Sequence, residues 1–470
     1  MVRPTSATAV AVLAVASVGC IPTAAFAAGI AVARFGAEHG HPTTDNPTAI
    51  YYNPAGLALG EGHRLFVDGA LALRSVSYER DPSAISDPAG TPADGLAANS
   101  GTASLFNFAG APFLGAATDL GVEGLGLALA FYVPFGGGAS WDQNSAYAGN
   151  TTYPGAVDGQ ARWFSIHGNM RSIYVTLGAA YRIPSIRLSF GATGSLVYSE
   201  VDTLRARNAD GTDDLVAGGT LKEGRSHLKV SGLQGAFGLG MIWEPTEGLF
   251  LGLSYQSRPN VSGGMELRGT LRNALGTAPV SESEVTFTQD LPDSVRIGGR
   301  FRLSPELELR LFGDWTQWQS FRRQCILDAN DPDRECERIN GGAARPGSHV
   351  PIAILERRWV NTWGVRGGVS WWPFEQLELM FGAGYDSNAI PDQTLDPALV
   401  DMDKGTLSAG ASYAVLEKLI FHLTFTQIIY ASRDTRGAYK ILAAPSAQPD
   451  GGGIYNQSIS LLNVAVEWAF

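Results

Sequence analysis

Six arginines are the side chains of this sequence best suited to hold a charged ligand. They are Arg296, Arg300, Arg302, Arg310, Arg358 and Arg366. Each alternates with apolar neighbours, and a period of two predicts that all six share one face of their segments. A guanidinium on that face could bind a carboxylate through charge-assisted hydrogen bonds. The same arginines could instead form a structural ladder with acids such as Glu308 and Glu378, and we favour this second interpretation.

A histidine pair near the N-terminus could bind a metal ion. His39 and His41 stand beside Glu38 and close to Asp45, yet their spacing matches no strong ligand pattern. The sequence has no Gly-x-Ser-x-Gly motif, Walker loop or paired-cysteine zinc pattern. We therefore expect no metal site, no cofactor and no enzymatic activity.

The first residues predict export. Met1–Arg3 is a short basic start, Ala7–Val18 is an apolar run, and Ala25–Ala27 has the small residues of a cleavage site. The apolar run is too short for a membrane-spanning helix, which needs about 20 residues. We expect residues 1–28 to be a signal peptide that is removed.

Two cysteines follow the predicted signal peptide. Cys325 and Cys336 are an even pair in an exported protein, so they could form a disulfide in a long predicted loop. Such a bridge could shape an entry mouth or merely staple an exposed loop, and we favour the staple. Cys20 lies in the signal, and cleavage before it is disfavoured because Ser17 stands where lipoprotein signals usually carry Leu, Val or Ile.

The segments that carry the arginines have the period of β-strands. Leu307, Leu309 and Leu311 alternate with Glu308 and Arg310, and similar alternation recurs to the end of the chain. No run of about 18 or more apolar residues is present, so no transmembrane helix is predicted. The net charge of −11 and the absence of a Lys/Arg block argue against a nucleic-acid partner.

The lengths of the connections choose between two β architectures. A soluble sandwich would also show alternating residues. Here, however, tight turns such as 304–306 and 372–375 alternate along the chain with long polar links such as 141–164 and 322–356. Short turns on one side and long loops on the other are typical of an outer-membrane barrel. We predict an all-β fold, a transmembrane antiparallel β-barrel of about 14 strands over residues 62–470.

The segment before the barrel, residues 29–61, predicts a plug. It is too long for a strand lead-in and too short for a domain, which needs about 50 residues. We expect a small N-terminal hatch that folds into the lumen. Within it, the sequence Asn53, Pro54, Ala55, Gly56 predicts a tight turn low in the lumen, with Asn53 fixing the local backbone.

The third predicted strand breaks its own pattern. Leu125–Val133 alternates well, but a proline without a donor and three glycines without side chains follow. The candidate residues for an opening in the barrel wall are Pro134, Phe135, Gly136, Gly137 and Gly138. Pro134 could instead simply end the strand, and the residues alone leave both interpretations open.

Five stretches of this sequence resemble the FadL/TodX family of outer-membrane transporters. Asp45–Leu57, with its Asn-Pro-Ala turn, is similar to that family's hatch, and Phe131–Gly136 to the end of its third strand. Leu291–Phe321 resembles its Leu-Pro-x-Ser and Trp pattern, and Gly235–Arg258 and Tyr385–Tyr413 complete the set.

The resemblance implies a function and partners. It implies passive uptake of long-chain fatty acids or hydrocarbons across a Gram-negative outer membrane by a monomeric barrel. Cargo would be captured outside, the hatch turn would move, and exit would be lateral near the third strand. A general diffusion porin for small polar solutes is the alternative. Further expected partners are outer-membrane lipid, lipopolysaccharide and, because the chain ends in the aromatic Phe470, the barrel assembly machinery.

Overall fold

A computed structural model describes residues 31–32, 34–217, 220–261, 264–331, 336, 351–438 and 448–470. The predicted signal peptide, residues 1–28, lies outside these ranges. Within them, no helix has the length and apolar character needed to cross a membrane.

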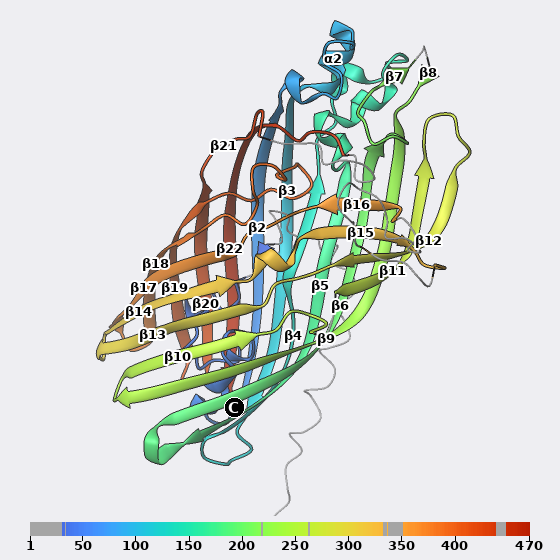
Figure 1. Ribbon diagram of the computed structural model, residues 1–470. Helices are drawn as coiled ribbons and strands as arrows, with labels where there is room; N and C mark the ends of the chain where they lie inside the picture. The colour runs from blue at the N-terminus through green and yellow to red at the C-terminus, as the bar shows by residue number, and fades with distance from the viewer. Residues whose placement is uncertain are drawn as a thin grey trace, which may run out of the picture.

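The main body of the chain is a closed antiparallel barrel of 14 strands (Figure 1), which confirms the predicted fold class. In order along the chain and around the barrel, the strands are β2 (His63–Arg80), β3 (Gly101–Thr118), β4 (Leu125–Ser140), β5 (His167–Ile183), β6 (Leu188–Arg207), β9 (Gly224–Thr246), β10 (Leu249–Gln256), β13 (Ser294–Ser304), β14 (Leu307–Thr316), β17 (Thr362–Phe374), β18 (Leu377–Asp386), β19 (Lys404–Leu416), β20 (Leu419–Tyr430) and β22 (Gly453–Ala469). The last strand pairs with the first, from Arg64 opposite Ala469 to Arg80 opposite Gly453. A closed sheet has no free edge, as the hydrocarbon core of a membrane requires.

Short turns join the strands at one end of the barrel and long links join them at the other. The long links contain strands that the sequence pattern did not predict: β11 (Met265–Ala274), β12 (Ser281–Gln289), β15 (Arg323–Asp328) and β16 (Ala353–Glu356). The first of them, β11, is explained by strand length, because β9 has 23 residues whereas β10 has 8. The upper part of β9 therefore needs another backbone partner, and β11 pairs with it.

Several short elements complete the structure. The hatch contains β1 (Ala31–Val32), η1 (Ala37–His39), α1 (Ala49–Tyr52) and η2 (Pro54–Leu59). The links contain η3 (Pro82–Ala84), α2 (Ala93–Asn99), η4 (Ser145–Tyr147), η5 (Pro154–Asp158), η6 (Gln160–Trp163), η7 (Pro184–Ile186), η8 (Trp318–Ser320), β7 (Val216–Ala217), β8 (Thr220–Leu221) and β21 (Arg433–Asp434).

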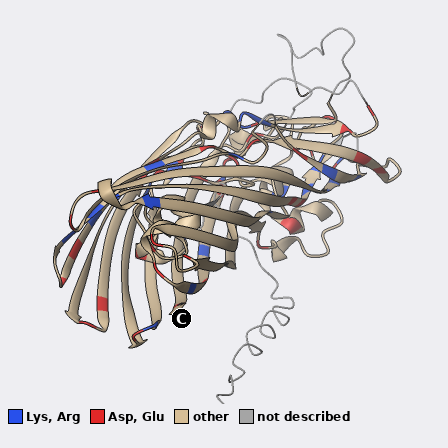
Figure 2. Ribbon diagram, turned by 90° about the horizontal axis from the view of Figure 1, so that it is seen from below, with Lys and Arg blue, Asp and Glu red and all other residues tan. Residues whose placement is uncertain are grey.

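The two faces of each barrel strand differ in chemistry. On β20, Leu423 is 53% exposed on the outside, whereas its neighbour Thr424 is 1% exposed and faces the lumen. Most of the barrel ribbon carries neither basic nor acidic residues (Figure 2). The outward face therefore suits contact with acyl chains, which is the arrangement of a transmembrane barrel.

Two large clusters of buried side chains fill much of the lumen. The lower cluster joins Tyr51 and Leu57 of the hatch to Tyr132 of β4, and the hatch lies inside the lower part of the barrel (Figure 1). The upper cluster, beneath the long links, includes Trp318 and Trp359. The hydrophobic core of this protein thus lies inside the barrel.

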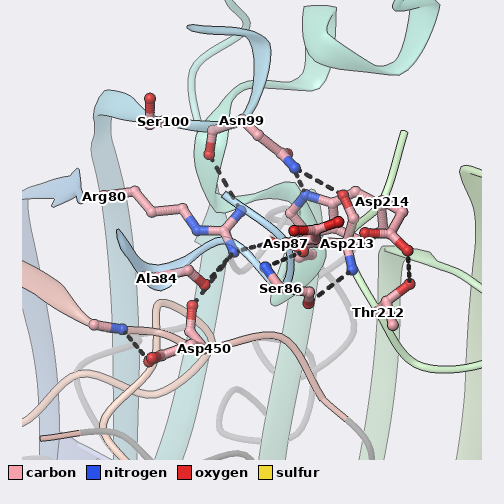
Figure 3. Close-up of polar contacts among 12 residues, drawn as sticks. Arg80, Ala84, Ser86, Asp87, Asn99, Ser100, Thr212, Asp213, Asp214 and Asp450 are labelled. Carbon is pink, nitrogen blue, oxygen red and sulfur yellow. Dashed lines mark hydrogen bonds and ion pairs between the residues drawn. The ribbon is translucent and has the colours of Figure 1, made fainter. Parts of the chain in front are cut away.

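A buried arginine holds three of the long links together (Figure 3). Arg80 forms an ion pair with Asp213 and donates through Nη1 to the carbonyl oxygen of Asn99 at 3.2 Å. Its Nη2 lies 3.4 Å from the carbonyl oxygen of Asp450, and Asp213 Oδ1 accepts from Ser86 N at 2.9 Å. Both charged side chains are fully buried, so the pair fixes the arrangement of the links above the lumen.

Substituting Arg80→Met should loosen these links, because it leaves the Asp213 carboxylate buried without its cation. Loss of one partner of a buried ion pair costs about 3–5 kcal/mol. We expect the link between β6 and β9 to become sensitive to protease while the barrel keeps its heat-modifiable migration. The double variant Arg80→Met/Asp213→Asn should recover much of the resistance, and equal sensitivity of both variants would contradict this account.

Candidate functional site

The hatch segment Asn53–Gly56 lies buried against the barrel wall. Asn53 Oδ1 accepts a hydrogen bond from Ala55 N at 3.1 Å and caps η2. Its Nδ2 donates to the carbonyl oxygens of Pro42 at 2.7 Å and Met241 at 3.0 Å. Asn53 therefore fixes the hatch backbone and also attaches it to β9. The segment begins a 3-10 helix, where the sequence suggested a tight turn.

Glycines on the lumen face of the wall make room for this segment. A Cβ atom on Gly240 of β9 would overlap Asn53 Oδ1, and one on Gly191 of β6 would overlap the Pro54 backbone. Gly126 of β4 approaches the Leu57 backbone in the same way. We call Gly126, Gly191 and Gly240 the glycine seat, and sequence reasoning missed it. The glycines are visible in the strands, but they become a single site when the barrel places them side by side.

Polar contacts hold the opposite side of the hatch. Asp45 accepts from Arg300 at 2.5 Å, and His39 Nε2 lies 3.0 Å from Glu378 Oε2 of β18. Gly36 N donates to Asp68 Oδ2 of β2 at 2.6 Å. The hatch is thus bonded to several strands around the lumen, each through one or two contacts.

The two hatch histidines respond to the lumen in opposite ways. Burial lowers the pKa of His39, but the Glu378 carboxylate raises it by more, so the pKa lies above its ordinary value. Burial, together with the charges of Arg310 and Arg300, holds the pKa of His41 well below its ordinary value. His41 accepts from Thr43 N at 3.3 Å. Among the described residues, no group of three or more potential ligands could hold a metal ion.

The wall of the barrel opens between β3 and β4. These strands pair from Thr118 opposite Leu127 to Phe113 opposite Tyr132, and their pairing ends there. Beyond that point β3 continues against β2, and β4 continues against β5. Pro112 is the next residue of β3 and has no N–H to donate. We call the space between residues 105–112 of β3 and 133–140 of β4 the wall gap.

A β-bulge in β4 accompanies the wall gap. Tyr132 pairs with Tyr174, but the next paired residue, Phe135, lies opposite Ser172, so β4 has one residue too many. The extra residue reverses the alternation, and Tyr132 and Phe135, three residues apart, both contact the lumen. Pro134 therefore lies inside the strand at the bulge and does not end it.

A side-chain contact crosses the wall gap, a short strand covers part of its edge, and a backbone contact ends it. Asn107 of β3 donates from its side chain to the carbonyl oxygen of Gly138 at 2.8 Å. Val32 and Ala31 of β1 pair with Phe135 and Gly136 on the edge that β3 has left. Above them, Asp142 N donates to Ser104 O at 2.8 Å and brings the two strands together again. Sequence reasoning missed Asn107 and Pro112, although a proline inside an alternating strand was a usable signal for the second.

Two cavities border the wall gap on the lumen side. The central cavity, of about 220 Å³, lies above the hatch and is lined by Tyr51, Tyr52 and Phe135 among others. The outer cavity, of about 90 Å³, lies under the long links and is lined by Gly137 and Ala139. The part of β4 that follows the bulge thus contacts both cavities.

Three of the six predicted lumen arginines are paired with acids inside the barrel. Arg310 Nη1 lies 3.4 Å from Glu308 Oε1 and donates to Ser370 at 2.6 Å. Arg366 donates to Asp314 at 2.7 Å and also pairs with Asp386. Arg300, as described above, holds Asp45. These three arginines form the structural ladder that we favoured.

The other three arginines have separate places. Arg302 lies at the turn end of β13 with its guanidinium 4.1 Å from the Trp372 ring, and Arg296 faces the central cavity. The expectation that Arg358 faces the lumen was wrong. It lies before the start of β17, its φ is 49°, and its side chain is 59% exposed. The reason is that Trp359 turns inward to pack against Trp318 at 4.9 Å.

Cys325 and Cys336 form a disulfide with a Cα–Cα distance of 5.9 Å. Cys325 is buried in β15, and Arg323 Nη1 donates to the carbonyl oxygen of Cys336 at 2.7 Å. The bridge lies in the link between β14 and β17, and neither sulfur lines the central or the outer cavity. This position fits a loop staple.

Comparison with known proteins gives a family and a set of similar structures. Residues 9–438 match the model of the outer membrane protein transport family (OMPP1/FadL/TodX). An outer membrane protein of Neisseria meningitidis serogroup B is 23% identical over 398 residues, which make up 81% of this chain and 80% of that protein. These matches confirm the outer-membrane location.

The solved structures share the fold. A Pseudomonas aeruginosa FadL homologue superimposes with a TM-score of 0.72 at 17% identity, over 94% of this chain and 100% of that chain. The Ralstonia pickettii toluene transporter TbuX gives 0.61 at 14% identity, over 92% and 95%. The Pseudomonas putida toluene transporter TodX gives 0.60 at 14% identity, over 90% and 94%.

Substituting Gly240→Val should unseat the hatch, because its side chain would occupy the position of Asn53. We expect the steady ion current through the purified protein in planar bilayers to rise several-fold over the unmodified protein. Gly235→Val is the matched control. Gly235 lies on the same strand, and a Cβ atom added to it would meet open space. Equal currents from the two variants would show that the glycine seat does not hold the hatch.

The hatch should respond to pH through its two histidines with opposite signs. His39, whose pKa is raised, stabilises the docked hatch below its unfolded pKa of about 6.5, and this stability is lost as pH rises through its folded pKa. His41, whose pKa is lowered, contributes stability above about pH 6.5 that is lost as pH falls.

The matched variants His41→Gln and His39→Gln separate these contributions. Hydrogen exchange of residues 49–57, followed by mass spectrometry between pH 5 and 9, should show protection that decreases with pH in His41→Gln. Protection should increase with pH in His39→Gln. The same slope in both variants would refute the assignment.

Proposed function

Because this chain belongs to the OMPP1/FadL/TodX family of outer membrane transport proteins, we propose that it carries hydrophobic compounds passively into the cell. Long-chain fatty acids and hydrocarbons are the proposed cargo. Two of the similar solved structures are toluene transporters, which supports a small hydrocarbon as one member of that class. The protein acts as a channel and not as an enzyme.

The wall gap beside the central cavity is the observation that carries this proposal. An apolar molecule gains about 25 cal/mol for each Å² that it removes from water, so returning it to water on the far side would be costly. An exit through the wall leads into the bilayer, where the molecule stays in an apolar medium. The wall gap lies beside Phe135 of β4. This residue lines the central cavity, and β1 pairs with it on the free edge of its strand.

The proposed path uses both cavities in turn. Cargo enters beneath the long links into the outer cavity, whose lining includes Phe164, Leu228 and Phe287. It then passes along the part of β4 that follows the bulge to the central cavity, and leaves through the wall gap. For this exit, β1 must release Phe135 and Gly136 from their backbone pairing.

The hatch closes the lower end of this path. Its segment Asn53–Gly56 is seated in the wall, and its tyrosines form the floor of the central cavity. We propose that a shift of this segment accompanies uptake and changes the shape of the floor. A general diffusion porin is the less favoured alternative, because the buried hatch residues occupy the space that a water-filled pore would need.

Deleting Pro134 should slow uptake. The deletion leaves Val133 alone between Tyr132 and Phe135, opposite Ile173 of β5, which removes the bulge and restores regular alternation. A regular β4 can pair with β3 further along its length and close the wall gap. Uptake of a radiolabelled fatty acid by a Gram-negative host without its own carrier should fall to nearly the level of cells that lack the protein.

Deletion of Gly437 is the matched control, because this residue lies in a long link with open space around it. It should leave uptake unchanged, and both deletions should retain heat-modifiable migration of a folded barrel. Normal uptake by the Pro134 deletion would count against lateral exit. A large steady current through the unmodified protein would support the porin alternative.

A further inference from the structure

Three neighbouring strands of the barrel wall are longer than a membrane crossing requires. β5, β6 and β9 have 17, 20 and 23 residues, whereas a tilted transmembrane strand needs about 9–11. At the end of the long links, the hairpin of β11 and β12 continues their sheet beside the upper part of β9 (Figure 1). The outward faces of these strands therefore extend beyond the acyl chains of the outer leaflet.

The outward side chains change from apolar to charged along one line across this sheet. Ile173 of β5 lies opposite Tyr198 of β6, and Tyr198 lies opposite Leu233 of β9. Tyr198 is 37% exposed and Leu233 is 64% exposed, and tyrosine is typical of the level at which a bilayer meets water. The membrane surface therefore lies at this row of residues.

Charged residues begin directly above that row. Two residues further along each strand, about 7 Å away, a first row of outward residues runs across four strands, and two more rows follow at the same spacing. In register from β5 to β11, the three rows are Arg171, Glu200, Ser231, Arg268, then Asn169, Asp202, Lys229, Thr270, and then His167, Leu204, His227, Arg272. Their charges thus lie at the height of lipid headgroups.

The two acids that β6 contributes to these rows already have partners. Glu200 Oε1 lies 2.8 Å from Arg171 Nε of β5. Asp202 Oδ1 lies 2.7 Å from His227 Nε2 of β9. Both acids are thus engaged by residues of the neighbouring strands.

Three cations of the rows have no such partner, and we call Lys229, Arg268 and Arg272 the outer cation group. All three side chains are exposed. No carboxylate of the described residues lies within 4.0 Å of their charged nitrogens. Lys229 lies between the two arginines, because its partner in the sheet, Thr270, separates them on β11. The outer cation group is therefore a compact set of charges that direct contacts do not neutralise.

Carboxylates are also present on this outward face. Glu266 of β11 and Glu282 and Glu284 of β12 are exposed there. With these acids nearby, the outer cation group alone would hold a small anion weakly. A tightly bound ligand therefore needs a second attachment, and the apolar surface around Tyr198 and Leu233 offers one.

We propose that the outer cation group binds the phosphates of lipopolysaccharide, the lipid of the outer leaflet. Its lipid A part carries phosphates and acyl chains on the same sugars, so its negative charge lies just above an apolar surface. The barrel offers the two attachments in the same order, with Leu233 below and Lys229 and Arg268 above. The planar donors of arginine suit phosphate oxygens. This site lies on the outside of the barrel and does not depend on the cargo.

The test compares lipid A with lipid A whose phosphates have been removed enzymatically. Native mass spectrometry of the purified full-length protein in detergent, with EDTA present to remove divalent cations, gives the affinity of each lipid. Lys229→Gln, Arg268→Gln and Arg272→Gln should each weaken binding of lipid A roughly two- to fivefold, and the triple variant roughly ten- to hundredfold. Binding of the dephosphorylated lipid should be weak and the same in every variant.

Arg436→Gln is the matched control, because Arg436 is an exposed arginine of a long link that lies outside the three rows. It should leave the affinity for lipid A unchanged. All variants should keep the heat-modifiable migration of a folded barrel, since the substituted side chains are exposed.

Three results would each overturn the proposal. The first is an unchanged affinity for lipid A in the triple variant, or equal losses for both lipids. The second is displacement of lipid A by an equal concentration of inorganic pyrophosphate, which would show a site for free phosphates. The third is binding that needs Mg²⁺ and is lost in Glu282→Gln/Glu284→Gln, which would show a metal bridge in place of direct contact.

Discussion

The structure depends on one constraint, which is that every backbone N–H and C=O group in contact with acyl chains must find a partner within the protein. Closure of β22 on β2 meets this constraint for the sheet as a whole. The wall gap departs from it, and the chain compensates locally. Asn107 supplies a side-chain donor to Gly138, and β1 supplies backbone partners to the exposed edge of β4. These contacts satisfy part of the strand edge that the wall gap leaves.

The hatch fills the space that closure of the barrel creates. A closed barrel of 14 strands has a lumen too wide for its own side chains, so a separate segment must fill it. Close packing on the glycines Gly191 and Gly240 fixes one side of the hatch, while single polar contacts such as that of His39 with Glu378 hold the other. Such an attachment depends on few strong bonds, and this is the kind of attachment that the proposed hatch movement requires.

Many charged side chains inside the lumen are paired. Several lumen arginines are neutralised by acids on the same or neighbouring strands, as Arg366 is by Asp314 and Asp386, because an unpaired charge in a confined space is costly. Arg296, by contrast, donates to the Tyr51 carbonyl oxygen of the hatch at 3.2 Å and also lines the central cavity.

The sequence by itself determined the architecture, because strand period, turn length and the Pro134 interruption are local properties of the chain. Leu309 and Arg310 on opposite faces already imply a two-faced wall, and strand closure follows from the need to pair every edge. Tertiary structure decided how the lumen arginines are paired. Arg296 and Arg366 look alike in the alternation. The strand register places Asp314 opposite Arg296, yet Asp314 accepts from Arg366 of the neighbouring strand, and only the folded barrel shows this. Contacts between distant strands are set by how the whole sheet closes, and that information is absent from any single segment.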